Sequence, residues 1–65
     1  MIYDNVKALC DKKGMSISAL EKAAGLGNAT VQGWKDSVPM VTSIKKVADV
    51  LGVSIEDIIK EKPDE

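Results

Sequence analysis

Two amide side chains stand four residues apart in a short polar segment of this 65-residue chain. They are Asn28 and Gln32, and Ala29 and Gly33 follow one position later. Side chains at i and i+4 share one face of a helix, so a helical segment would project both amides together. A carboxamide donates and accepts side by side, as paired hydrogen bonds to N6 and N7 of adenine require, and an alanine methyl can meet the methyl of thymine. The pattern makes Asn28, Ala29, Gln32 and Gly33 candidates for contact with DNA bases, although amides on a short helix are more often plain solvated surface.

Other groups near this segment are suited to hold phosphates. Lys35 offers a cation and Thr30 a hydroxyl, and the backbone N–H groups at the N-terminus of a helix bind anions. Two of the expected helices begin near Ser16 and Thr42. The candidate phosphate contacts are therefore Ser16, Ile17, Thr30, Lys35, Thr42 and Ser43. Without a fold to place them, the same residues would be interpreted as helix caps and solvated surface.

The chain lacks the residue sets that catalysis and metal binding use. It has no histidine and a single cysteine, Cys10, so neither an internal disulfide nor a Cys/His zinc cluster can form. No base is present to activate a serine hydroxyl, and there are no paired carboxylates and no phosphate-binding loop. We expect no enzymatic activity, no metal, no cofactor and no small-molecule ligand. Cys10 is expected to be a small buried apolar group.

Composition places the chain among small globular domains. Its hydrophobic fraction of 45% is too high for a disordered segment, and no apolar run approaches the roughly 18 residues of a membrane-spanning helix. The first residues offer neither the basic nor the apolar part of an export signal. We expect a cytoplasmic protein without a membrane partner.

Charge is unevenly distributed along the chain. The formal net charge is −1, but residues 1–55 sum to +2 and the last ten residues to −3. An acidic C-terminus of this kind would face away from a phosphate backbone. All the basic residues are lysines, and because arginine is the commonest reader of guanine, its absence suggests an A·T-rich target.

Apolar residues recur at spacings of three and four, which predicts an all-α fold. A first helix is expected over about 2–13. A second follows the cap residue Ser16 and stops at Gly25, where the turn needs a left-handed backbone conformation. A third helix is expected over about 28–35, with Val31 and Trp34 facing the core, although Trp34 stacking on a base is the alternative.

Two more helices complete the pattern. The strongest amphipathic stripe lies just before Gly52, which ends the fourth helix, and it consists of Ile44, Val47, Ala48 and Leu51. The fifth helix begins at the cap residue Ser54, with Asp57 in the place of a capping-box acid, and closes the domain near Lys60. A domain over 1–62 and a frayed acidic tail over 63–65 are expected.

The sequence resembles the Cro and phage-repressor family of helix-turn-helix DNA-binding domains. The residues that carry the resemblance are Lys13-Gly14-Met15-Ser16, Leu20, Gly25-Leu26, Thr30-Val31, Trp34, Pro39, Ile44, Val47-Ala48-Asp49 and Leu51-Gly52-Val53-Ser54. The resemblance implies a compact five-helix bundle of the lambda-repressor-like kind, with the helix-turn-helix formed by the second and third helices. It also implies binding to operator DNA, commonly as a dimer, with residues 28–35 in the major groove.

Three positions depart from the family pattern. Glu21 stands where the family favours alanine, and we expect it to turn outward, toward Lys22 or Lys35. Ser37 stands where glycine is frequent, and it would need a strained backbone or a different cap. Asp36 places an anion at the end of the segment 28–35, where it would repel phosphate if it pointed toward DNA.

Two functions are compatible with these features. The first is a sequence-specific double-stranded DNA-binding transcriptional regulator, a repressor that occupies an operator as a homodimer. The expected dimer contact consists of Ile55, Ile58 and Ile59, since these cannot all point into so small a core; the alternative is that two are core and one is exposed. The second function is a protein-interaction module of the same fold, of the antitoxin or anti-regulator type, that uses this apolar face.

Overall fold

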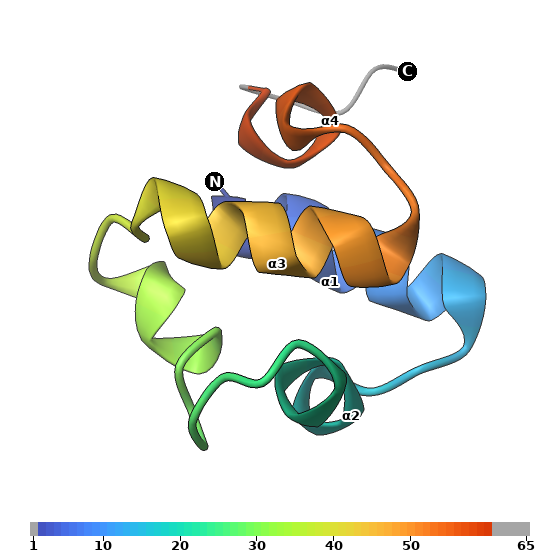
Figure 1. Ribbon diagram of the computed structural model, residues 1–65, viewed down its shortest axis with the longest axis horizontal. Coiled ribbons are helices and arrows are strands. Elements are labelled where there is room, and N and C mark those ends of the chain that lie inside the picture. Colours follow the sequence, from blue (N-terminus) through green and yellow to red (C-terminus); the bar gives the residue numbers. More distant parts are fainter. Residues whose placement is uncertain (1, 61–65) are drawn as a thin grey trace.

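The computed structural model describes residues 2–60, which form four α-helices and one short 3₁₀ helix (Figure 1). In chain order these are α1 (Ile2–Lys13), α2 (Ile17–Ala23), η1 (Gln32–Lys35), α3 (Val41–Leu51) and α4 (Ile55–Ile59). Helices α1 and α3 cross the middle of the molecule, with α2 on one side and α4 on the other. No β-strand occurs in the described range. The all-α prediction is confirmed, while the predicted tail over 63–65 and the boundary at residue 62 lie outside the described residues.

Helix α2 begins where the sequence predicts. The Ser16 hydroxyl oxygen accepts a hydrogen bond from the backbone N–H of Ala19 at 3.0 Å. This bond satisfies one of the N–H groups that the first turn of a helix leaves without an intrahelical partner, and such a cap contributes about 1 kcal/mol.

Helix α4 is only five residues long and depends on its capping box. The Ser54 hydroxyl accepts from the N–H of Asp57 at 3.2 Å, and the Asp57 carboxylate accepts from the N–H of Ser54 at 3.3 Å. Just before it, Gly52 ends α3 in the left-handed conformation, with φ of 70°. Both features confirm the predicted junction between the last two helices.

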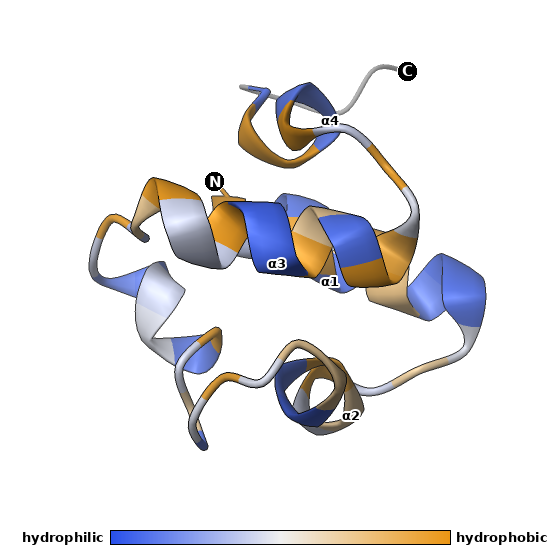
Figure 2. Cartoon of the chain, viewed as in Figure 1, coloured by the Kyte–Doolittle hydropathy of each residue, from blue (hydrophilic) through white to orange (hydrophobic). Residues whose placement is uncertain are grey.

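The core receives apolar side chains from every element. Figure 2 shows the mixture of apolar and polar residues along α3, which turns one face inward. The buried apolar residues are Val6, Cys10, Ile17, Leu20, Val31, Trp34, Ile44, Val47, Ala48, Leu51 and Ile58. Burial of one such Val, Leu or Ile side chain is worth about 1.5–3 kcal/mol. The core positions predicted for Cys10, Val31 and Trp34 are confirmed.

A buried amide joins the two ends of the described chain. Asn5 of α1 is 4% exposed, and its Nδ2 donates to the carbonyl oxygens of Ile58 at 2.8 Å and Lys60 at 2.7 Å. The last carbonyls of a helix have no intrahelical donor, so this amide satisfies groups at the end of α4 that would otherwise need water. Asn5 therefore fastens the shortest α-helix to α1.

The predicted α-helix over 28–35 is wrong. Asn28 to Val31 form successive turns, and only Gln32–Lys35 is helical, as a 3₁₀ helix. The break falls at Ala29, whose φ of 64° lies in the left-handed region that residues with a side chain seldom adopt. The expected bundle of five helices is thus four α-helices and η1 over the described residues.

Two causes for this break are visible. The Glu21 carboxylate accepts hydrogen bonds from the N–H groups of Ala29 and Val31, which holds the backbone in the turn. Gly33 also lies within the segment, and glycine disfavours a helix by about 1 kcal/mol relative to alanine. A segment of eight residues has too few intrahelical hydrogen bonds to overcome both effects.

Candidate nucleic-acid interface

Two buried side chains anchor the segment 28–35, and its other residues are exposed apart from the half-buried Thr30. Val31 is fully buried and Trp34 nearly so, as the sequence predicts. The four residues predicted to contact bases, Asn28, Ala29, Gln32 and Gly33, are all exposed. Asn28 precedes the break at Ala29 and Gln32 follows it, so the two amides do not share one face of a continuous α-helix. The segment nevertheless presents both amides on the outside of a fixed piece of backbone.

Glu21 holds this backbone in place. Its side chain extends from α2 and is only 4% exposed. Oε1 accepts from the N–H of Ala29 at 3.1 Å and Oε2 accepts from the N–H of Val31 at 2.9 Å. Hydrogen bonds to an ionised carboxylate are roughly twice as strong as neutral ones, and these two compensate the desolvation of the charge.

The prediction that Glu21 turns outward toward Lys22 or Lys35 is therefore wrong. The N–H groups of Ala29 and Val31 need acceptors, and the Glu21 carboxylate supplies them. An exposed ion pair with Lys22 or Lys35 would stabilise the protein less. One signal in the sequence was available: an acid at a helix position where the packing favours a small side chain requires a buried partner.

Two hydroxyls bind the backbone of the same segment. Thr30 Oγ1 donates to the carbonyl oxygen of Gly27 at 2.7 Å, and Ser37 Oγ donates to that of Gly33 at 3.0 Å. The Ser37 contact is the different cap that the sequence left open as an alternative to a strained backbone. The single Thr30 O–H is already donated to the Gly27 carbonyl. Its predicted contact with a phosphate, which only accepts, would therefore need the O–H to rotate or a bridging water to donate.

Lys35 lies at the end of η1 against α1. Its Nζ is 4.9 Å from the centroid of the Tyr3 ring, within the range of a cation–π interaction. Asp36 follows directly and is also exposed, so the local charge at this end of the segment sums to zero. The Lys35 ammonium group is therefore held near Tyr3, at the end of the segment 28–35. Its contact with a phosphate remains a prediction.

The remaining predicted phosphate residues lie at two helix N-termini. Ser16 is the cap of α2 and Ile17 its first residue; the Ile17 side chain is buried, so only its backbone N–H could bind a phosphate. Thr42 and Ser43 lie in the first turn of α3, where Met40 is the cap residue without a side-chain hydrogen bond. The N–H groups of this first turn point out of the helix and suit an anion.

The predicted dimer contact is only partly accessible. Ile58 is fully buried, so its inclusion in an intermolecular contact is wrong; it packs in the core of its own chain. Ile55 is half-buried against that core and Ile59 is 46% exposed. A five-residue helix presents few outward positions, and one of its three isoleucines is needed to fasten it.

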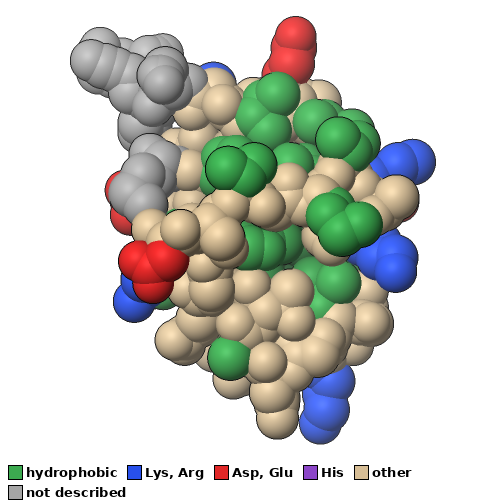
Figure 3. Space-filling model, turned by 90° about the vertical axis from the view of Figure 1, so that its left-hand side faces the viewer, with side chains coloured by type: hydrophobic (Ala, Val, Ile, Leu, Met, Phe, Trp, Pro, Cys, Tyr) green, Lys and Arg blue, Asp and Glu red, His purple; other side chains and the backbone are tan. Residues whose placement is uncertain are grey.

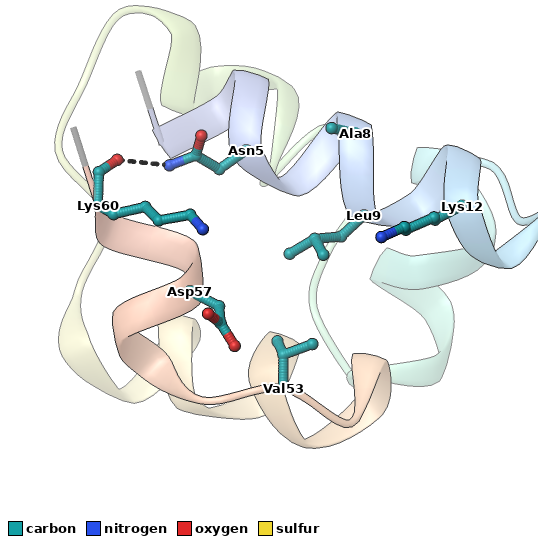
Figure 4. Close-up of a pocket in the computed structure, with 7 residues that line it drawn as sticks. All are labelled: Asn5, Ala8, Leu9, Lys12, Val53, Asp57 and Lys60. Atoms are coloured by element: carbon teal, nitrogen blue, oxygen red, sulfur yellow. Dashed lines mark hydrogen bonds between the residues drawn. The ribbon is translucent and has the colours of Figure 1, made fainter. Parts of the chain in front are cut away.

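A groove between α1 and α4 lies outside the segment 28–35 (Figure 4). It is lined by Asn5, Ala8, Leu9, Lys12, Val53, Asp57 and Lys60 and has a volume of about 520 Å³. The Asn5 amide binds the Lys60 carbonyl, and the Asp57 carboxylate binds the N–H of Ser54. Among the lining residues this leaves two lysine ammonium groups and the buried Asn5 Oδ1, which has no hydrogen-bond partner among the described residues, beside an apolar floor. These groups do not form the convergent polar set of a ligand site.

Cys10 is a free thiol buried in the core. Burial, with a smaller contribution from the charge of Asp11, raises the pKa of the Cys10 thiol above its usual range. The neutral thiol is a poor nucleophile and a poor metal ligand. Within residues 2–60 no group of three His, Cys, Asp or Glu side chains is placed to hold a metal ion, and none of the described helices is long and apolar enough to cross a membrane.

The fold and the exposed segment define a class: a small all-helical domain in which residues 24–31, a series of turns, join α2 to η1. The sequence model of the Cro/C1-type helix-turn-helix DNA-binding domain matches residues 5–64. The chain therefore belongs to this family. No curated protein and no solved structure matches the chain significantly. Family membership makes it a helix-turn-helix DNA-binding protein of the regulator type.

Proposed function

We propose that this protein is a sequence-specific transcriptional regulator that represses by occupying an operator in double-stranded DNA. The observation that carries the proposal is the segment 28–35, which exposes two amides from a backbone held by Glu21 inside a Cro/C1-type domain. Such preorganisation matters because a segment already fixed in the free protein loses little conformational entropy when it binds.

In the proposed complex this segment enters the major groove. Asn28 and Gln32 make paired hydrogen bonds to adenines, the Ala29 methyl meets a thymine methyl, and Gly33 lets the backbone approach closely. The chain contains no arginine, so we propose an A·T-rich half-site. Each paired amide–adenine contact is worth about 1–3 kcal/mol of discrimination against the wrong base.

Phosphates on either side of the groove fix the orientation of the domain. We assign this role to Lys35, to the Thr30 hydroxyl and to the N-termini of α2 and α3 around Ser16, Ile17, Thr42 and Ser43. The net charge of −1 makes the electrostatic attraction weak. A single domain of this kind would bind loosely, and two copies on a two-fold operator would bind more tightly.

Substitution of the two amides tests base contact directly. The double variant Asn28→Ala and Gln32→Ala removes both without touching the core, since the two positions are exposed. We expect an unchanged unfolding transition and a loss of preference between a cognate and a scrambled duplex. Ala8→Ser, an uncharged change on the exposed side of α1, is the matched control and should keep the preference. Retention of full preference by the double variant would refute the assignment.

A protein-interaction module is the second candidate. Two features favour it. The net charge is −1, and the negative charge of Asp36 offsets the positive charge of Lys35 at the end of the segment 28–35. In this case the apolar face of α4, with Ile59 at its centre, would bind a partner protein. Ile59→Lys would then abolish the regulatory effect while Asn28→Ala and Gln32→Ala would leave it intact, the reverse of what DNA recognition predicts.

A further inference from the structure

The groove between α1 and α4 is positively charged on a chain whose net charge is negative. Its lining contains two lysines, Lys12 and Lys60, and one acid, Asp57, so these charges sum to +1. The formal net charge of the whole chain is −1. The Asp57 carboxylate is hydrogen-bonded to the N–H of Ser54, whereas neither lysine takes part in a salt bridge within residues 2–60. Two cations are therefore available to a partner at this groove.

The two lysines stand at opposite ends of an apolar floor. Figure 4 shows their side chains pointing into the groove from opposite sides, with Leu9 between them. Leu9 and Val53 are half-buried, so each packs on the core with part of its surface left open. The buried Asn5 side chain forms part of the wall and offers no accessible group to a partner. The groove thus presents a cation, an apolar surface and a second cation in a row.

This combination distinguishes the groove from the apolar end of the molecule where η1 leads into α3. Val38, Met40 and Val41 are 87%, 68% and 69% exposed there. Figure 3 looks onto this end and shows apolar side chains gathered on it, with charged side chains mostly around the edge. An apolar surface without charges of its own does not select one kind of partner. In the groove, the two cations define the chemistry of the partner as well as its position.

We propose that the groove binds an extended acidic segment of a partner protein. One apolar side chain of that segment lies on Leu9 and Val53, and a carboxylate on each side of it pairs with Lys12 or Lys60. The volume of about 520 Å³ holds a few residues of an extended chain and not a folded element. Exposed ion pairs each contribute little and are screened by salt. The segment accordingly binds weakly, and the lysines select acidic partners over neutral and basic ones.

A polypeptide fits this groove better than a small anion does. The polar groups of a small-molecule site converge on one point, whereas these two ammonium groups lie on either side of Leu9. Side chains at i and i+2 of an extended chain share one face, so an apolar residue with acids two positions before and after it matches the row of groups. The chain's own residues 61–65 include acids but no Val, Leu, Ile, Met or aromatic residue, so they lack the apolar anchor.

This inference goes beyond the proposed function and does not depend on it. Helix α4 lies on the opposite side of α1 and α3 from α2 (Figure 1), and none of the residues that line the groove belongs to the segment 28–35. A partner bound between α1 and α4 therefore leaves the exposed residues of that segment accessible. A protein that binds DNA through the segment 28–35 would in this way hold a second protein at the operator.

Titration of the isotopically labelled full chain with a synthetic peptide tests the proposal by NMR. The probe is the capped peptide Glu-Ser-Leu-Ser-Glu, whose Glu and Leu side chains share one face when it is extended. At about 50 mM salt we expect a dissociation constant on the order of 1 mM, with amide shifts at residues 8–12, 53 and 57–60 and none over 28–35. The control peptides Gln-Ser-Leu-Ser-Gln, without the charges, and Glu-Ser-Ser-Ser-Glu, without the anchor, should each bind at least about fivefold more weakly.

Substitution of the two lysines tests the groove on the protein itself. Lys12→Gln together with Lys60→Gln should weaken binding of the probe about fivefold. The matched control, Lys13→Gln together with Lys46→Gln, removes the same charge from positions outside the groove lining and should stay within about twofold of the unmodified chain. All four lysines are exposed, so both variants should fold as the unmodified chain does, and circular dichroism and an unfolding curve verify this.

Four results would overturn the proposal. They are no shift in the groove at about 10 mM probe, equal binding of the probe and either control peptide, equal loss of affinity in the two lysine variants, or shifts confined to residues outside the groove. Acetate at the same carboxylate concentration should leave the groove unshifted; if it reproduces the shifts, the groove binds small anions only and the proposal fails.

A dilution series of the chain alone excludes a second copy as the occupant. Groove signals that stay constant with concentration support a separate partner, whereas signals that shift as the concentration rises would show that another copy of the chain fills the groove. None of these measurements contains DNA, so failure of the proposed function and failure of this proposal are observed separately.

Discussion

The carboxylate of Glu21 accepts a hydrogen bond from the backbone N–H of Val31 at 2.9 Å, and its second oxygen binds the N–H of Ala29. One buried side chain of α2 thereby fixes the backbone that exposes Asn28 and Gln32. The Glu21 carboxylate therefore links α2, the first helix of the helix-turn-helix motif, to the surface that we propose contacts DNA.

Replacing Glu21 should destabilise the protein and loosen the segment 28–35. Glu21→Gln keeps the size of the side chain but loses the charge and one acceptor, so we expect a loss of about 1–3 kcal/mol in the free energy of unfolding. Urea denaturation measures it. Lys22→Gln, at the exposed next position of α2, serves as the control and should leave the stability nearly unchanged. A Glu21→Gln variant as stable as the unmodified chain would contradict this role.

Removing the Asn5 amide should release α4. Asn5→Ala loses the two hydrogen bonds to the carbonyls of Ile58 and Lys60. We expect a cost of about 2 kcal/mol, because two acceptors lose their donor. Hydrogen exchange should show α4 opening more often while α2 keeps its protection. Uniform loss of protection across all helices would show instead that α4 does not open separately.

The Lys35 ammonium should contribute to DNA affinity without contributing to sequence preference. Lys35→Gln is expected to lower affinity similarly for all duplexes and to reduce the slope of log affinity against log salt by about 1. Lys60→Gln, at the end of α4, is the control and should leave the slope unchanged. The measurement is a salt titration by fluorescence anisotropy, and an unaltered slope for Lys35→Gln would remove this residue from the set of phosphate contacts.

Stability should fall at alkaline pH through Cys10. Burial raises the pKa of this thiol in the folded chain above the value of 9.0 that an unperturbed thiol has. The unfolded chain therefore loses the proton first, so deprotonation favours unfolding. The contribution of Cys10 is complete below about pH 8 and declines as the pH rises through about 9.

Thermal unfolding between about pH 7 and pH 10 measures this effect. Cys10→Ala lacks the titrating group and should lose less stability over that range than the unmodified chain does. If both chains lose stability in parallel, the burial of Cys10 has no share in the alkaline effect.

The sequence alone was sufficient to predict those features of the fold that depend on neighbouring residues. Ser16, Gly52 and the pair Ser54 and Asp57 act on residues within three or four positions, and each ends or begins a helix as its type predicts. The periodic stripe of α3 likewise identified its buried residues. These features need no knowledge of the rest of the chain.

Contacts between distant residues were not predictable in the same way. The break at Ala29 depends on a carboxylate eight residues earlier, and the position of α4 depends on Asn5, which lies 53 residues before Ile58. From helical periodicity we predicted a continuous helix over 28–35 and an exposed Glu21. A periodic pattern contains no information about which backbone N–H groups lack a hydrogen-bond partner. The residue types predicted for base contact were nonetheless found exposed on one segment.

Selection from a library of random DNA duplexes, at low salt and with sequencing of the retained molecules, tests the central claim most directly. Specific recognition by the segment 28–35 predicts enrichment of an A·T-rich motif with two-fold symmetry and half-sites about one helical turn apart, and no such motif with the Asn28→Ala and Gln32→Ala variant. Retention of duplexes without any shared motif, or no retention at all, would contradict the account of this protein as a sequence-specific regulator.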